Sequence, residues 1–169
     1  MNFKKIICWP PLLAGIGAAT TISILGYITF ESFLAGTNYG FWLAASFGSS
    51  VVLVFGYPNN EFAQPKNIFF GHLLCAFVGV IFVTLFKVSQ DNTIFFFAIG
   101  LAIGISVMLM MIFKITHPPA GGNTIVVILA QDSFQFLVFP IMVGTITIII
   151  GGIIYNRYIL KKNYPLKWF

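Results

Sequence analysis

Gly48-Ser-Ser-Val-Val-Leu-Val-Phe55 and Gly122-Asn-Thr-Ile-Val-Val-Ile-Leu129 are near copies of one pattern within an otherwise lipid-like sequence. In each string, a glycine and two small polar residues precede a run of apolar residues. The N–H groups in the first turn of a helix need polar partners, which hydrocarbon cannot supply. We therefore predict that each string begins a helix inside a membrane, and that the two helix starts face one buried anion site.

The composition is that of a membrane protein. Apolar residues make up 59% of the 169 residues and charged residues only 8%, whereas soluble domains carry about 25% charge. The mean hydropathy is +0.96. We expect an all-α integral membrane protein in which residues 1–169 form a single transmembrane domain, with membrane lipid as a partner and no nucleic-acid partner.

A helix needs about 20 apolar residues to cross a bilayer. Two apolar segments, Phe41–Tyr57 and Pro118–Ala130, fall short of that length, and these two contain the related strings. The long apolar segments are Trp9–Phe30, Asn67–Phe86, Thr93–Phe113 and Phe134–Tyr155.

The order of these segments predicts two inverted repeats. Long, short and long segments follow one another twice, over residues 9–87 and 93–156. The middle segment of each set is expected to be discontinuous, part extended chain and part half-helix, which places a binding site near the midplane. Two alternatives stay open: the short segments are re-entrant, or the similar strings recur by chance.

Lys and Arg predict the orientation. With six crossings and a cytoplasmic N-terminus, all but one of the nine Lys and Arg residues fall inside, and Lys87 falls outside. The re-entrant alternative also places both termini inside. We expect an inner-membrane protein with cytoplasmic N- and C-termini, whose basic aromatic tail, residues 157–169, lies at the anionic headgroups.

Two blocks of sequence resemble the HPP family of small integral membrane proteins. The first is Thr116-His117-Pro118-Pro119-Ala120-Gly121-Gly122, which contains the tripeptide that names the family. The second runs from Phe47 to Phe55 and continues through Ala63-Gln-Pro-Lys-Asn67 and Gly71-His72. Members from cyanobacteria and chloroplasts are known as nitrite transporters, so the resemblance implies nitrite. Gly121-Gly122-Asn123 departs from the Gly-Ala that is more frequent in the family, and this makes the site more polar.

The tripeptide His117-Pro118-Pro119 predicts extended backbone, because each proline restricts the residue before it and donates no hydrogen bond. A new helix can begin from Ala120. Its first turn would bind a small oxyanion, and the substrate-binding residues expected from both strings are Gly48, Ser49, Ser50, Gly121, Gly122, Asn123 and Thr124. The alternative is that these groups cap the helix for each other and that the glycines only ease packing.

Two histidines and two lysines lie toward the cytoplasmic ends of their segments. We expect them, with the two prolines, to form a gate or vestibule for the anion: His72, Lys66, Lys114, His117, Pro118 and Pro119. Each histidine could instead be a hydrogen-bonded polar residue at the membrane border, or a ligand of a metal or haem.

The sequence thus favours a transporter or channel-like permease for a small monovalent oxyanion, with nitrite as the leading candidate. A membrane redox protein that binds haem or quinone through His72 and His117 is the alternative, and a structural or assembly subunit is a third. We expect no enzyme, no cofactor and no metal site, because no motif for these occurs. A homo-oligomer is a further expectation, since six short segments give little bulk around a pathway.

Overall fold

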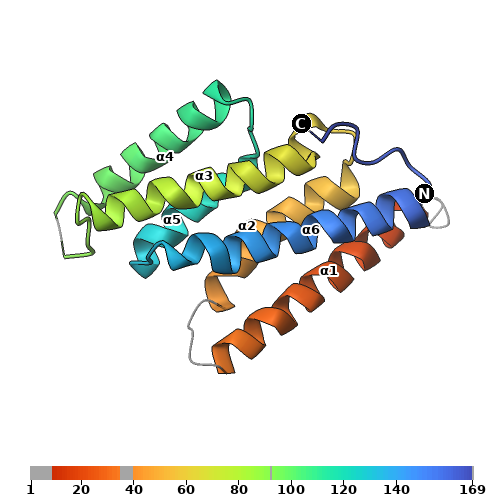
Figure 1. The fold of residues 1–169 in the computed structure, drawn as a ribbon, viewed down its shortest axis with the longest axis horizontal. Coiled ribbons are helices and arrows are strands. Elements are labelled where there is room, and N and C mark those ends of the chain that lie inside the picture. Colours follow the sequence, from red (N-terminus) through yellow and green to blue (C-terminus); the bar gives the residue numbers. More distant parts are fainter. Residues whose placement is uncertain (1–8, 35–39, 92, 169) are drawn as a thin grey trace, which may run out of the picture.

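The fold is a bundle of helices that run back and forth along one axis (Figure 1). The computed structural model describes residues 9–34, 40–91 and 93–168, which contain no strand. The prediction of an all-α protein is confirmed for this part of the chain. The main helices are α1 (Trp9–Leu34), α2 (Gly40–Val51), α3 (Pro65–Thr84), α4 (Phe95–Ile112), α5 (Gly121–Ala130) and α6 (Val143–Ile153). The short 3₁₀ or π-helical pieces are η2 (Val52–Gly56), η3 (Glu61–Ala63), η4 (Pro118–Ala120), η5 (Leu137–Met142) and η6 (Ile154–Ile159).

The lengths of the helices agree with the hydropathy of the sequence. Two apolar helices, Ser46–Gly56 and Pro118–Ala130, are shorter than a normal span. Four helical stretches of the described chain are long and apolar enough to cross a membrane: Pro11–Thr29, Pro65–Thr84, Phe95–Ile112 and Leu137–Ile159. All six predicted segments are therefore helical at the expected places.

Successive main helices alternate in direction (Figure 1). Gly17, near the start of α1, lies against the rings of Phe55 in η2 and Tyr155 in η6. Thr21, one turn later, lies against Gly151 of α6. Because the start of α1 meets the later parts of the α2 and α6 segments, α1 is antiparallel to both.

The helices form two groups that meet along α3. Helices α1, α2 and α6 pack together on one side, and α3, α4 and α5 pack on the other (Figure 1). Half of the α3 span is buried, against at most a third of the other long spans, so α3 is the central helix.

Small residues allow α3 to pack closely against α5. Gly71 and Gly79 of α3 face α5 and the turn before it: a Cβ added at Gly71 would lie 2.9 Å from Cβ of His117, and one at Gly79 would lie 2.8 Å from Cβ of Val127. The glycines of α3 therefore allow a close helix contact inside the chain. An added Cβ at Gly100 or Gly104 of α4 would meet nothing within 4 Å.

The last long segment is not one straight helix. Phe139 has extended backbone angles, φ −127° and ψ 114°, next to Pro140. Proline lacks the N–H that would continue the helix and clashes with the preceding turn. The uninterrupted segment predicted from Phe134 is wrong in this detail, because the chain bends at Phe139 and the regular helix α6 begins at Val143.

The charged side chains gather at the ends of the bundle. Lys66, Lys114 and Arg157 lie at the end where α3 begins and α4 and α6 finish, with the described tail cations Lys161, Lys162 and Lys167. Lys87 follows α3 at the opposite end. Lys4 and Lys5 lie outside the described residues.

The chain after α6 packs back onto the bundle. Residues Ile154–Ile159 continue the helix as η6, and Tyr164 is then buried, with 1% of its surface exposed. The amide N–H of Leu166 donates to Oε1 of Gln64 at 2.8 Å. Tyr164 thus packs on protein and Trp168 is exposed, and the location of the tail at lipid headgroups stays a prediction.

Candidate functional site

Four buried polar side chains meet where the two helix groups join: Ser50, His72, His117 and Asn123. Oγ of Ser50 lies 2.8 Å from Nε2 of His72 and 2.8 Å from Nε2 of His117. The amide nitrogen of Asn123 lies 2.7 Å from Nδ1 of His72. His72 is about 10 Å along α3 at 1.5 Å per residue, and α3 is long and apolar enough to cross a hydrocarbon layer of about 30 Å. Ionisable residues at such depth mark ion pathways and proton relays.

The partners of each atom fix the direction of these hydrogen bonds. The Asn123 nitrogen also donates to the backbone oxygen of His72 at 3.3 Å, so the nitrogen and not the oxygen of the amide faces Nδ1. Nδ1 of His72 therefore accepts, and Nε2–H donates to Ser50. Nδ1 of His117 lies 2.7 Å from the backbone oxygen of Phe62, which can only accept, so this Nδ1 carries a hydrogen. Ser50 then donates to the bare Nε2 of neutral His117.

Ser50 reaches this position from the middle of a helix. The prediction that Gly48 begins a half-helix is wrong, because α2 begins at Gly40 and continues through η2 to Gly56, a length of about 25 Å. Glycine and serine weaken a helix by at most about 1 kcal/mol per residue, and no proline interrupts this segment. The Ser50 hydroxyl lies 3.1 Å from the backbone oxygen of Ser46, one turn earlier. The predicted pair of opposed helix starts is therefore absent here.

The second predicted helix start is present. His117 is extended, with φ −138° and ψ 96°, and α5 begins at Gly121 after the turn η4. The expectation of extended chain through both prolines is wrong, because Pro118–Ala120 forms a 3₁₀ turn closed by the N–H of Ala120 donating to the His117 oxygen at 2.9 Å. Proline at the first turn costs no hydrogen bond, so the break and the new helix start can be this close together.

The predicted residue Thr124 belongs to a second polar contact. Its hydroxyl donates to the backbone oxygen of Cys75 at 2.9 Å and lies 2.9 Å from Oγ of Ser106. All three residues are buried. Thr124 therefore joins α5 to α3 and α4, one residue beyond Asn123, and its oxygen already has protein partners.

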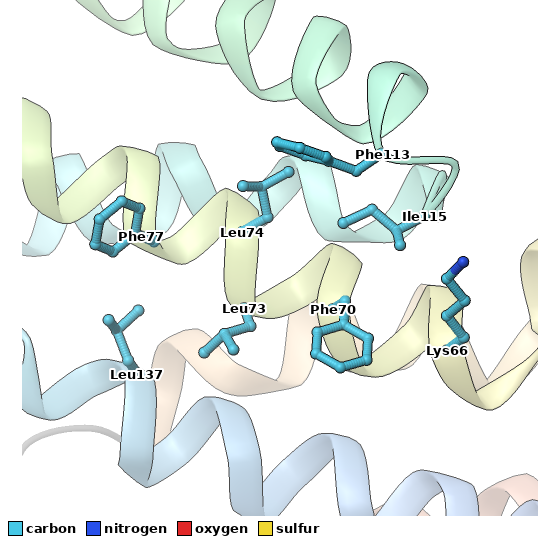
Figure 2. A pocket seen from close by; sticks show the side chains of 8 residues that line it. All are labelled: Lys66, Phe70, Leu73, Leu74, Phe77, Phe113, Ile115 and Leu137. Atoms are coloured by element: carbon cyan, nitrogen blue, oxygen red, sulfur yellow. The ribbon is translucent and has the colours of Figure 1, made fainter. Parts of the chain in front are cut away.

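A large groove of the described chain lies away from the polar network. It holds about 500 Å³ and runs along the outer face of α3, between Phe113 after α4 and Leu137 in η5 (Figure 2). Its lining is apolar except for Lys66 at one end. Figure 2 shows this Lys66 side chain beside Ile115. An apolar groove of this kind does not fit a small anion.

A family comparison supports the resemblance that the tripeptide His117-Pro118-Pro119, just before α5, suggested. The model of the HPP transmembrane region matches residues 5–165. The chain belongs to the HPP family. The resemblance noted in the sequence is thereby confirmed.

Two relatives of this HPP-family chain are transmembrane proteins of Dictyostelium discoideum. One is 35% identical over 131 residues, which cover 75% of this chain and 45% of the relative. The other is 30% identical over 133 residues, 76% of this chain and 42% of the relative. The chain thus spans less than half the length of these relatives. No solved structure matches it significantly.

Several predicted site residues of this HPP-family chain lie outside the network. Ser49 is exposed on α2, Gly48 is half-buried, and Gly122 faces Oγ of Ser46, 3.4 Å from where its Cβ would be. Gly121 has open space around its Cβ position. Only some of the predicted gate residues lie in the network. His72 and His117 do, whereas Pro118 and Lys114 are exposed and Pro119 is half-buried.

The sequence did not point to the Phe62 carbonyl, to Ser46 or to Asn67. Nδ2 of Asn67 donates to the backbone oxygen of Thr116 at 2.8 Å and thereby fixes the residue before His117. Asn67 could have been identified from the sequence, because it belongs to the second HPP-family block and follows the proline that begins α3. The carbonyl oxygen of Phe62 could not have been identified, because a backbone group leaves no pattern in the residue types.

The geometry does not favour haem between the two histidines. Their ring centroids are 5.0 Å apart, and the Ser50 hydroxyl lies between the two Nε2 atoms. A porphyrin between the rings would need that space, and each ring nitrogen already has a protein partner. Within the described residues, no group of three or more His, Cys, Asp or Glu could hold a metal.

Proposed function

We propose that this HPP-family chain transports a small monovalent oxyanion, with nitrite as the first candidate. The observation that supports this most is the buried network of Ser50, His72, His117 and Asn123 at membrane depth. Polar and ionisable groups are costly to bury in a membrane bundle, and where they occur they mark substrate and ion pathways. The family resemblance supplies nitrite as the substrate to test first.

The charges of the described chain support an anion over a cation. Glu61, Asp91 and Asp132 lie in connections between the main helices, and Glu31 follows the apolar stretch Pro11–Thr29 of α1, so none of the four carboxylates lies in the middle of an apolar span. The network instead offers hydroxyl, amide and imidazole N–H donors. The ten-residue helix α5 begins beside it, and a helix N-terminus carries about half a positive charge. Only one such helix start supports the site, since α2 begins elsewhere.

We propose that the anion binds between Ser50, Gly122, Asn123 and His117. These residues lie on both sides of the α2–α5 contact, where the Ser46 side chain meets Gly122. A small separation of α2 from α5 would free the Ser50 hydroxyl from His117 and open space beside Gly122 for an anion. The absence of a side chain at Gly122 allows that approach.

Matching glycine contacts support the inverted repeat. Gly71 and Gly79 of α3 pack against His117 and Val127. In the same way, Gly144 and Gly152 of α6 pack against Phe47 and Val54 of the α2 segment. Both glycine pairs have the same spacing, so α3 would correspond to α6.

The same correspondence pairs α2 with α5. In this correspondence Ser50 is equivalent to Asn123. The alignment is shifted by one residue from the one that the two strings suggest in the sequence. These two residues hold the two ring nitrogens of His72. If the repeats are real, the network lies on the axis that relates them, which is where transporters with inverted repeats bind substrate.

The distribution of cations supports a cytoplasmic location for the end that carries Lys66, Lys114 and Arg157. We propose an inner-membrane protein whose C-terminal tail is cytoplasmic, and we extend this to the N-terminus because α1 begins at the same end (Figure 1). An anion entering a negative interior loses about 2.3 kcal/mol per 100 mV, so inward transport needs an anion gradient or a coupled ion. We propose no enzymatic activity and no resident cofactor, and a homo-oligomer stays a prediction.

Uptake into proteoliposomes tests this function. We expect the purified chain to admit nitrite faster than protein-free vesicles, and to discriminate among nitrite, nitrate, formate and chloride. Protein-free vesicles measure the passive entry of nitrous acid. Equal uptake with and without the protein for all four anions would contradict the proposal and leave the structural-subunit alternative.

A further inference from the structure

The Ser50 hydroxyl has two acceptors within reach of its single hydrogen. One is Nε2 of His117 at 2.8 Å, and the other is the backbone oxygen of Ser46 at 3.1 Å. Neutral His117 needs the hydrogen, because its Nε2 is bare. A doubly protonated His117 would instead donate from Nε2 to Ser50, and the Ser50 hydrogen would then turn to Ser46. No heavy atom has to move between the two arrangements.

We infer that Nε2 of His117 is a proton-binding site that couples anion transport to one proton. This inference rests on the proposed function and adds its coupling ion. The proton binds at Nε2 from solution, and the Ser50 hydrogen rotates from His117 to the Ser46 carbonyl. No covalent bond other than the new N–H forms, and none breaks.

His72 cannot take the proton in the same geometry. Its Nδ1 accepts from Asn123, whose nitrogen is held by the backbone oxygen of His72. A hydrogen on Nδ1 would face that amide nitrogen, and turning the amide would bring its oxygen against the backbone oxygen. His72 is therefore a positioning residue that keeps its Nε2–H directed at Ser50.

The other titratable groups around the pair lie at the edges of the site. Lys114 and Glu61 are exposed and Lys66 is half-buried, and none of the three has a hydrogen bond with either imidazole within the described chain. Two further groups on packed elements have other partners: the Tyr164 hydroxyl donates to Ala63, and the Cys75 thiol lies 3.6 Å from the sulfur of Met110. His117 is therefore the residue that binds the proton.

The buried position links the proton to the anion. A charged imidazolium surrounded by protein and lipid is unfavourable alone, and so is an unpaired oxyanion. Together they form a neutral pair, so each raises the affinity for the other by the same factor. Transport by this route moves no net charge.

Proton movement in proteoliposomes measures the coupling. Nitrite is added outside vesicles that hold a pH-sensitive dye, with the membrane potential clamped by valinomycin and potassium. We expect interior acidification of about one proton per nitrite above the protein-free background, at a rate that does not follow the potential. Nitrite entry that follows the potential without acidification overturns the coupling and leaves the transport function intact.

Two variants separate the roles of the residues. His117→Asn keeps an N–H for the Phe62 oxygen but has no Nε2, and it should lose the acidification that accompanies nitrite entry. Ser50→Ala should weaken it strongly, because the protonated Nε2 then has no acceptor. Ser23→Ala, at an exposed position of α1, is the matched control and should behave as wild type. Unchanged coupling in His117→Asn overturns the inference.

The proton site can also be tested by a measurement that does not depend on anion transport. The imidazole nitrogen shifts of ¹⁵N-histidine-labelled chain in nanodiscs are followed with pH, with and without nitrite. We expect nitrite to move the protonation of His117 upward by about one pH unit or more, a tenfold coupling, while His72 keeps its Nε2–H form. Titration of His72 instead, or no effect of nitrite on His117, overturns the proton site whatever the flux shows.

Discussion

The hydroxyl of Tyr164 donates to the backbone oxygen of Ala63 at 2.8 Å, one residue from the Phe62 oxygen that accepts from His117. Gln64, the next residue, accepts from the tail amide of Leu166. Three consecutive residues of the α2–α3 connection thus link the C-terminal tail to the imidazole of the HPP tripeptide. The tail is part of the structure that holds His117 in place.

Tyr164→Phe should lower the stability of the fold. The change removes the hydroxyl and leaves the Ala63 oxygen without its donor, which costs about 1 kcal/mol or somewhat more. Thermal unfolding of the purified chain in detergent measures the loss. Tyr158→Phe, at a side chain that is 62% exposed, is the control and should leave the midpoint unchanged. An equal midpoint for both variants would mean that the tail contact adds no stability.

Asn123→Leu should abolish nitrite uptake in proteoliposomes. Leucine cannot donate to Nδ1 of His72, so the tautomer that directs His72 at Ser50 is no longer held. The buried Nδ1 loses its partner, and we expect a loss of stability of about 1–3 kcal/mol. Asn59→Leu, at an exposed position of the α2–α3 connection, is the control. Retained uptake in Asn123→Leu would count against the proposed site.

Gly79→Ala should destabilise the packing of α3 on α5. The new Cβ would lie 2.8 Å from Cβ of Val127 and 3.1 Å from the Thr124 oxygen, and overpacking of this kind costs about 1–3 kcal/mol. Gly100→Ala meets open space on α4 and should be neutral or stabilising, because alanine favours helix by up to about 1 kcal/mol. Unfolding midpoints that change equally would show that the close contact is not as tight as described.

Asp132 should make stability depend on pH. Burial raises the pKa of its carboxyl to about 6 in the folded chain, against about 4 when unfolded. The folded state therefore binds more protons between these values, and stability falls as pH rises from about 4 to 6. Asp132→Asn should remove this slope in thermal unfolding measured across that range, whereas Asp91→Asn, at an exposed position, should keep it. A stability that rises with pH over this range would contradict the assignment.

The purified chain should show no Soret band. The two histidine rings are 5.0 Å apart with Ser50 between them, which leaves no space for a porphyrin in this arrangement. A visible absorption spectrum of protein purified without added haem tests the redox alternative directly. A strong Soret band that is lost in His117→Asn would revive that alternative.

Much of the fold follows from local sequence. The positions of the long spans depend on runs of apolar residues, and each run is helical where it was expected. The break before α5 was predictable because Pro118 and Pro119 donate no hydrogen bonds. The prediction that a helix begins at Gly48 was wrong because no proline interrupts that string. Gly48, Ser49 and Ser50 resemble a helix start, but a helix can pass through them when nothing forces it to stop.

The amino-acid sequence by itself determined that this is a membrane bundle, where its long helices lie and where α5 begins, since hydropathy and proline act within a few residues. Only the tertiary structure decided that Ser50 bridges His72 and His117, that a backbone oxygen of Phe62 orients His117, and that Gly79, not Gly100, supports close packing. Those relationships join residues from 22 to 67 positions apart. They depend on how whole helices pack, and no local pattern in the sequence encodes them.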